Sequence, residues 1–155
     1  MTFVKKYVGG FFNSEIVFME SEIFKHRLRV RYAETDQMGV VYYANYFVWF
    51  EAARTDFLRT IGMPYKSLEQ QGIFLPVVEA YARYIAPAFY EDEIVVEIQL
   101  KEIKSASLKI FYNVKRCSDN KLLVEGYTKH TVINKNGKIK RMPDNLRERL
   151  NEYLC

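Results

Sequence analysis

The 155-residue chain has little of the chemistry that several functional classes require. It contains two cysteines, Cys117 and Cys155, two histidines, His26 and His130, and four prolines. The cysteines lie far apart and one is the last residue, so no structural disulfide is implied and a reducing compartment is expected. Four cysteine and histidine residues this scattered make no metal site, and no serine, cysteine or aspartate stands at triad spacing from either histidine.

Long runs of one kind of residue are missing as well. No apolar stretch is long enough to span a bilayer, and the first 18 residues have neither the uninterrupted apolar core nor the cleavage site of a signal peptide. No long basic run occurs, so the net charge of +4 favours a phosphate-bearing ligand or a solvated surface over nucleic acid. We therefore expect a cytoplasmic protein without a membrane span and without a nucleic-acid partner.

What the chain does have is a globular composition that is rich in aromatic residues. Hydrophobic residues make up 49%, charged residues 27% and aromatic residues 15%, which suits strands, a lined pocket or a subunit interface. This length predicts one domain, over residues 22–155. Residues 1–21 form an extension that could be an extra strand, a disordered arm, or the result of an upstream start codon before Met19.

Hydrophobic periodicity predicts one strand, one long helix and then mainly strands. Residues 23–32 alternate apolar and basic side chains, as a half-buried strand does. An apolar stripe of helical period follows, with Asn45 as N-cap, Gly62 just past the end and Pro64 beyond it. A short helix is expected over residues 64–71, and a last helix over 144–154. Strands are expected at 74–85, 94–103, 108–114 and 122–133, and their short connections predict antiparallel pairing.

The strongest chemical signal lies where the first strand gives way to the long helix. Asp36 stands in a short glycine-containing loop that leads directly into the helix start. A helix start leaves unpaired N–H groups with partial positive charge. A carboxylate beside such donors can attack a carbonyl and stabilise the resulting oxyanion. The alternative for Asp36 is a turn aspartate that accepts backbone hydrogen bonds.

The segment Asp36-x-x-Gly39-Val40-Val41-Tyr42-x-x-Asn45-Tyr46, continuing to Glu51-x-x-Arg54, resembles the 4-hydroxybenzoyl-CoA thioesterase-like proteins. In particular it resembles their Tol-Pal-associated acyl-CoA thioesterase branch. The resemblance covers roughly residues 22–141 and implies an α+β hotdog fold, in which an antiparallel sheet of about five strands curls round one long helix. It also implies hydrolysis of an acyl-CoA to free acid and CoA, no metal or redox cofactor, and a homo-oligomer, either a dimer or a dimer of dimers.

The resemblance also implies roles for single residues. Asp36 is the catalytic carboxylate, acting as nucleophile or as general base, and the Tyr43 backbone N–H is the oxyanion donor. Gly39 lets the loop backbone approach the thioester, and Lys104 and Ser105, with Lys101, are expected to contact CoA. The basic group Lys138, Lys140 and Arg141 is a second candidate for that contact. Many members of the Tol-Pal branch carry histidine where this chain has Tyr43.

Alternatives remain for the acid and for the function. Glu51 is a rival carboxylate on the long helix, with an ion pair to Arg54 as its structural role, and Glu34 is expected to be solvated or paired with a strand arginine. A hotdog hydratase is disfavoured, because no histidine lies between Arg27 and Lys129. A non-catalytic scaffold that binds acyl-CoA or an acyl carrier is the alternative from another class. Among substrates, the motif wording favours an aliphatic acyl group.

Overall fold

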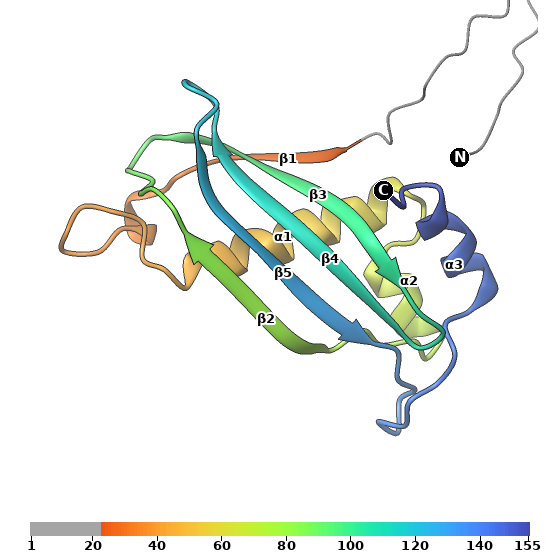
Figure 1. The fold of residues 1–155 in the computed structure, drawn as a ribbon. Helices are drawn as coiled ribbons and strands as arrows, with labels where there is room; N and C mark the ends of the chain where they lie inside the picture. Colours follow the sequence, from red (N-terminus) through yellow and green to blue (C-terminus); the bar gives the residue numbers. More distant parts are fainter. Residues whose placement is uncertain (1–22) are drawn as a thin grey trace, which may run out of the picture.

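The computed structural model describes residues 23–155, so the extension predicted over residues 1–21 lies outside the described part. Its elements are, in chain order, β1 (Phe24–Arg29), the 3₁₀ turn η1 (Tyr32–Glu34), α1 (Asn45–Thr60), α2 (Tyr65–Gln70), β2 (Val77–Tyr84), β3 (Glu93–Ile103), β4 (Ser107–Arg116), β5 (Leu122–Thr131) and α3 (Asp144–Asn151) (Figure 1). Every predicted strand and helix therefore exists, with ends shifted by a few residues. The last helix ends at Asn151, before the predicted residue 154.

The five strands form one antiparallel sheet in the order β1-β3-β4-β5-β2. The short connections do form hairpins between β3 and β4 and between β4 and β5. A hairpin between β2 and β3, which its short connection predicted, is not formed. Instead β2 pairs with β5 at one edge, and residues 85–92 carry the chain across to β3 near the other edge.

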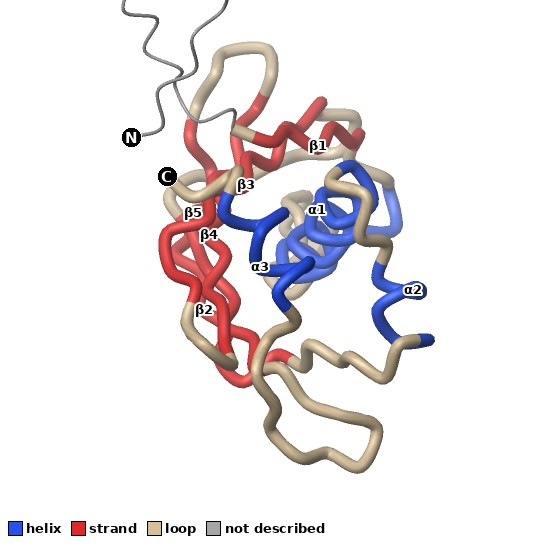
Figure 2. Tube along the Cα trace, turned by 90° about the vertical axis from the view of Figure 1, so that its right-hand side faces the viewer, coloured by secondary structure: helices blue, strands red, loops and turns tan. Residues whose placement is uncertain are grey.

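The long helix α1 packs against the concave face of this sheet. Figure 2 shows the strands on one side of α1, with β1 arching over it. The predicted apolar stripe is buried, namely Tyr46, Phe50, Ala53, Phe57 and the following Ile61. Phe50 stacks on Tyr112 of β4 with the ring centroids 4.2 Å apart. The predicted antiparallel sheet curled round one long helix is thus confirmed.

The start of α1 differs from the prediction in one detail. Asn45 is the first helical residue, and Ala44 occupies the N-cap position without a side-chain cap. The Asn45 amide instead donates from Nδ2 to the Glu34 carbonyl oxygen at 2.8 Å. The prediction of Asn45 as N-cap was wrong because this side chain ties the helix to the preceding loop. At the other end, Gly62 has the left-handed φ of 77° expected just past a helix.

Candidate active site

The segment from residue 35 to 43, which we call the site loop, folds back on itself before α1. Thr35 and Val41 form an antiparallel bridge, and the Asp36 N–H donates to the Val40 carbonyl at 2.9 Å. The Gly39 N–H donates to the Asp36 carbonyl at 2.9 Å, and Gly39 has a φ of 77°. A Cβ on Gly39 would meet no atom within 4 Å. Within the described chain, glycine is therefore favoured here by the backbone turn and not by crowding.

Asp36 lies at the base of this turn and is half-buried. Its Oδ1 accepts a hydrogen bond from the Met38 N–H at 2.8 Å, which is the geometry of a turn aspartate. Among residues 23–155, no donor reaches the second carboxylate oxygen. The turn therefore fixes the orientation of the carboxylate through one oxygen and leaves the other oxygen available for chemistry.

Tyr43 lies on the other arm of the loop, directly before the helix. Within the described part of the chain, its backbone N–H donates to no carbonyl and to no side chain. The residues around it are fixed, since the Tyr42 N–H donates to the Glu34 carbonyl at 2.9 Å and the Asn45 N–H to the Tyr42 carbonyl at 3.0 Å. The structure thus brings Asp36 and an unpaired donor at the start of α1 into the same loop.

Glu34 is the residue that fastens the site loop to α1. Its carboxylate accepts hydrogen bonds from the Arg31 N–H at 2.8 Å, the Arg31 guanidinium at 3.1 Å and the Trp49 indole at 3.0 Å. Burial alone would raise the pKa of the Glu34 carboxyl, but these donors outweigh it and hold the pKa below its usual value. The pairing with a strand arginine is confirmed, whereas the solvated alternative was wrong, because Glu34 is only 6% exposed.

Exposed aromatic side chains gather round the same end of the molecule. They are Tyr32, Tyr42, Tyr43, Tyr84, Phe89 and Tyr90. The ring centroids of Tyr42 and Tyr43 are 4.6 Å apart, and Tyr43 meets Tyr84 edge-on at 6.4 Å. An exposed apolar surface of this kind suits a bound apolar group or a subunit interface.

Sequence reasoning missed Tyr84, the last residue of β2. Its hydroxyl donates to the Tyr43 carbonyl at 3.0 Å. No local pattern could have predicted this contact, because 41 residues separate the two side chains along the chain.

Lys104 and Ser105 lie in the β3–β4 hairpin, at the opposite end of the sheet from the site loop (Figure 1). The loop sits at the Glu93 end of β3, where the Val30 N–H donates to the Asp92 carbonyl at 2.9 Å. With 11 residues in β3 and about 3.3 Å per residue, roughly 30 Å separates the two ends. A single copy of the chain therefore does not bring the predicted CoA contacts to Asp36.

The rival acid Glu51 is exposed on α1 and accepts a hydrogen bond from the Thr55 hydroxyl at 2.9 Å. The predicted ion pair with Arg54 is not formed in the described structure. Arg54 faces the sheet instead, where its charge acts on Tyr112 and His130. The predicted ion pair is absent because the Arg54 side chain takes a partly buried position between α1 and the sheet, away from the exposed Glu51.

The two histidines are both engaged in hydrogen bonds away from the site loop. His26 contacts Asp56 of α1, with Nδ1 and Oδ2 2.6 Å apart. His130 is buried, and its Nδ1 lies 2.9 Å from the Leu75 carbonyl, while its Nε2 lies 2.8 Å from the Thr128 hydroxyl. Because a carbonyl can only accept, the proton is on Nδ1, and Nε2 accepts from Thr128. This chain of bonds fits a structural histidine.

Along the outward face of β1 and just beyond its end, every second residue is basic and exposed, namely Lys25, Arg27, Arg29 and Arg31. Three of them are neutralised by carboxylates, in the pairs Lys25–Glu97, Arg29–Glu93 and Arg31–Glu34. A stripe whose charges are already paired attracts phosphate backbones weakly.

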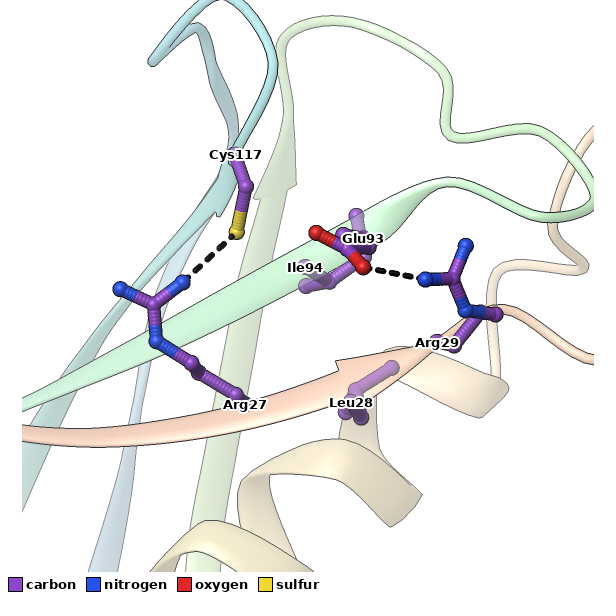
Figure 3. A pocket seen from close by; sticks show the side chains of 6 residues that line it. All are labelled: Arg27, Leu28, Arg29, Glu93, Ile94 and Cys117. Atoms are coloured by element: carbon purple, nitrogen blue, oxygen red, sulfur yellow. Dashed lines mark hydrogen bonds and ion pairs between the residues drawn. The ribbon is translucent and has the colours of Figure 1, made fainter.

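Two recesses open on the described surface. One, of about 220 Å³, is lined by Arg27, Leu28, Arg29, Glu93, Ile94 and Cys117, and Figure 3 shows Arg27 and Cys117 pointing toward each other. The other, of about 340 Å³, is lined by Tyr65, Phe74, Pro76, Ile133, Asn134, Lys135 and Gly137. Neither recess is lined by Asp36 or Tyr43. Tyr43 is exposed and Asp36 is half-buried, so in one copy of the chain the candidate site lies at the surface.

Comparison with known proteins decides the family. The profile of the "Thioesterase-like superfamily" matches residues 30–150, which is most of the chain. The chain belongs to this superfamily. The predicted resemblance to the 4-hydroxybenzoyl-CoA thioesterase-like proteins and the predicted hotdog thioesterase class are thereby confirmed, while the Tol-Pal-associated branch stays a prediction.

Solved structures of similar proteins superpose on the described fold. The hypothetical protein TT1821 from Thermus thermophilus is 41% identical, with a TM-score of 0.77 over 82% of this chain and 96% of that one. The hypothetical protein AQ1494 from Aquifex aeolicus is 35% identical, with a TM-score of 0.78 over 82% and 98%. The Haemophilus influenzae protein named acyl-CoA thioesterase YbgC is 37% identical over 86 residues, which are 55% of this chain and 63% of that protein.

The described residues contain neither a cluster of metal-ligating side chains nor a membrane-spanning helix. Between residues 23 and 155, no three histidine, cysteine, aspartate or glutamate side chains gather as metal ligands. None of the helices in that range is both long and apolar enough to cross a membrane.

Proposed function

We propose that this thioesterase-superfamily protein hydrolyses the thioester of an acyl-CoA, with Asp36 as the catalytic carboxylate. One observation carries the proposal. The site loop holds Asp36 through a single oxygen, and the same loop leaves the Tyr43 N–H unpaired at the start of α1. A carboxylate and a preorganised donor in one rigid loop are the two groups that acyl transfer to water needs.

In the proposed reaction, the thioester carbonyl oxygen accepts a hydrogen bond from the Tyr43 N–H. Asp36 then either removes a proton from an attacking water or attacks the carbonyl carbon itself, and in both cases the C–S bond breaks and CoA leaves as a thiolate. The thiolate takes up the proton held by Asp36 in the first route and a proton from water in the second. In the second case water afterwards hydrolyses the acyl–aspartyl anhydride. The partial positive charge at the start of α1 stabilises the oxyanion in either route. Loss of one such donor typically costs ~2.7–4 kcal/mol of transition-state stabilisation.

The acyl group is proposed to be aliphatic. The wording of the motif around Val40-Val41-Tyr42 and Glu51-Ala52-Ala53-Arg54 supports this, and so does the similarity to a protein named acyl-CoA thioesterase. The exposed aromatic side chains round the site loop offer the apolar surface that such a chain would contact. A cytoplasmic location belongs to the same proposal, since acyl-CoA and the free Cys117 thiol both suit a reducing compartment.

A homo-oligomer completes the proposed site. Strand β2 is an edge of the sheet and is exposed over nearly its whole length, with Val77, Val78, Tyr81 and Tyr84 all exposed. A long apolar edge of this kind is normally covered. If a second copy pairs with β2 across a two-fold axis, the two β2 strands run antiparallel, and the hairpin with Lys104 and Ser105 turns toward the Asp36 end of its partner.

The proposal is tested by measuring thiol release from a panel of acyl-CoAs, from acetyl through palmitoyl together with benzoyl types. Asp36→Asn keeps the shape of the side chain and is expected to abolish turnover, whereas the control Glu51→Gln should keep it. Full activity in Asp36→Asn with loss in Glu51→Gln would transfer the role to Glu51. Wild-type protein that binds acyl-CoA without turnover on any chain length would favour the non-catalytic scaffold.

A further inference from the structure

The backbone on either side of the Tyr43 N–H is held by two contacts from different parts of the chain. On the preceding side, the Tyr42 N–H donates to the Glu34 carbonyl at 2.9 Å. On the following side, the Tyr43 carbonyl accepts from the Tyr84 hydroxyl at 3.0 Å. The N–H of Tyr43 lies between these two anchors and, within residues 23–155, is itself unpaired. It shares its peptide with the Tyr42 carbonyl, which accepts from the Asn45 N–H at 3.0 Å, so its direction depends on that bond together with the two anchors.

Tyr84 is well placed to act as a rigid anchor. It stands at the end of β2, in register with Val124 of β5, so its backbone belongs to the sheet. Its ring meets the buried ring of Tyr46 edge-on, with centroids 5.5 Å apart, and the ring of Tyr43 at 6.4 Å. Burial and the neighbouring Tyr43 raise the pKa of Tyr84, so that its hydroxyl remains a donor at neutral pH.

We propose that Tyr84 is a positioning residue, whose hydroxyl holds the peptide that follows Tyr43 and thereby limits rotation of the neighbouring peptide, so that the Tyr43 N–H points at the thioester oxygen. The inference rests on the proposed thioesterase function. It adds to the site a residue from the end of the edge strand β2. The Tyr84 hydroxyl is engaged with the backbone and is not assigned to the substrate. Because oxyanion stabilisation depends on donor direction at the transition state, loosening this peptide should slow the chemical step more than it weakens substrate binding.

The test compares Tyr84→Phe with wild type and with Tyr153→Phe. Tyr153 is the control, because its ring also meets another ring edge-on, that of Phe57, and it lies outside both the site loop and β2. In Tyr84→Phe we expect kcat to fall about tenfold with KM within about twofold of wild type, which is less than the loss of a whole oxyanion donor. Tyr153→Phe should match wild type in both constants, and all three proteins should melt within a few degrees of one another, since only one exposed hydrogen bond is lost.

A second readout does not depend on activity. In protein labelled with [¹⁵N]tyrosine, the Tyr43 amide cross-peak, assigned with Tyr43→Phe, should move in Tyr84→Phe and stay in place in Tyr153→Phe. A cross-peak that stays in place in Tyr84→Phe overturns the inference. So does an unchanged kcat together with weaker binding of a non-hydrolysable thioether analogue of the acyl-CoA, since the hydroxyl would then contact the substrate. If wild type shows no turnover, the proposed function fails, and the cross-peak still decides whether Tyr84 orients the peptide.

Discussion

Glu34 and Trp49 show, at the scale of single residues, how a carboxylate becomes part of a folded framework. From the sequence, Glu34 is one of three polar residues in a turn, and only its spacing from Arg31 suggests a partner. Its burial depends on Trp49, a residue 15 positions later that donates its indole N–H to Oε1. A buried carboxylate is stable only when donors surround it, so the contact and the burial arise together. The local sequence pattern therefore indicates the arginine partner of Glu34, but it cannot indicate the tryptophan partner.

Asp36 and Tyr43 illustrate the opposite case. Both were predicted from a short contiguous motif, and the structure holds both in one loop of nine residues that pairs with itself. Local spacing is informative here because the turn at Gly39 brings the two arms together without any distant element. Their chemical roles remain predictions, to be decided by turnover.

His130 supplies a prediction at this scale about stability and pH. Burial, with a contribution from the nearby Arg54 charge, lowers its pKa from 6.5 to about 4, against the opposing effect of the bond to the Leu75 carbonyl. Between these two values the unfolded chain binds a proton that the folded chain does not. The contribution of neutral, buried His130 to the free energy of unfolding is therefore complete above about pH 6.5. As the pH falls toward 4, the free energy of unfolding drops by about 3 kcal/mol in all.

Urea denaturation from pH 8 to pH 4.5 measures this dependence. We expect His130→Gln to be less stable than wild type at pH 8, because a buried partner of Thr128 is replaced. The slope of its stability between pH 6.5 and 4.5 should be flatter than that of wild type. An equal slope in both proteins would show that another group carries the acid sensitivity, and Glu34 would be the next candidate because its lowered pKa acts in the same direction at lower pH.

The helices and strands were predictable where the spacing of apolar residues within the segment itself has the period of a helix or of a strand. The stripe of α1 and the alternation in β1, β3, β4 and β5 gave the right element type in each case. The partner of β2 was not predictable in this way, because strand order depends on which surfaces the sheet buries and not on the length of one connection. The connection formed by residues 85–92 is short, yet it crosses from one edge of the sheet toward the other. A hydrogen bond from the Val41 N–H to the Ala88 carbonyl anchors it.

Gly126 supplies the prediction at the scale of elements. It lies in β5 beneath α1, where a Cβ would be 2.3 Å from the Tyr81 carbonyl oxygen and 3.0 Å from the Phe50 ring. Neither the β2 backbone nor the stacked Phe50 can move without disturbing the packing of helix on sheet. We expect Gly126→Ala to lower the free energy of unfolding by about 2–3 kcal/mol, within the range of overpacked cores.

Urea unfolding of Gly126→Ala beside Gly72→Ala separates crowding from backbone strain. Gly72 has a φ of 71° and open space round its Cα, so its substitution costs only the left-handed conformation, about 1 kcal/mol. If Gly126→Ala proves no more costly than this control, helix α1 is packed more loosely on β5 than the structure indicates.

At the scale of the whole molecule, the two halves of the proposed site lie at opposite ends of one sheet. Asp36 is at the end where β3 begins, and Lys104 is in the hairpin where β3 ends, so an acyl-CoA that contacts both must bridge two copies of the chain. The exposed edge β2 offers the surface on which a second copy would pair in antiparallel fashion. A two-fold pairing makes each site a composite of one copy's loop and the other copy's hairpin.

This arrangement predicts complementation between two defective proteins. Asp36→Asn should have no turnover, and Lys104→Glu should have a strongly raised KM because it places a negative charge at the proposed phosphate contact. If the two are unfolded and refolded together, half of the dimers contain one copy of each, and one of their two sites combines an intact Asp36 with an intact Lys104. Activity at substrate concentrations below KM should then return to about a quarter of wild type in proportion to the mixed dimers formed. The same proteins mixed without unfolding serve as the control, and a refolded mixture no more active than that control would mean that each site is built within a single copy.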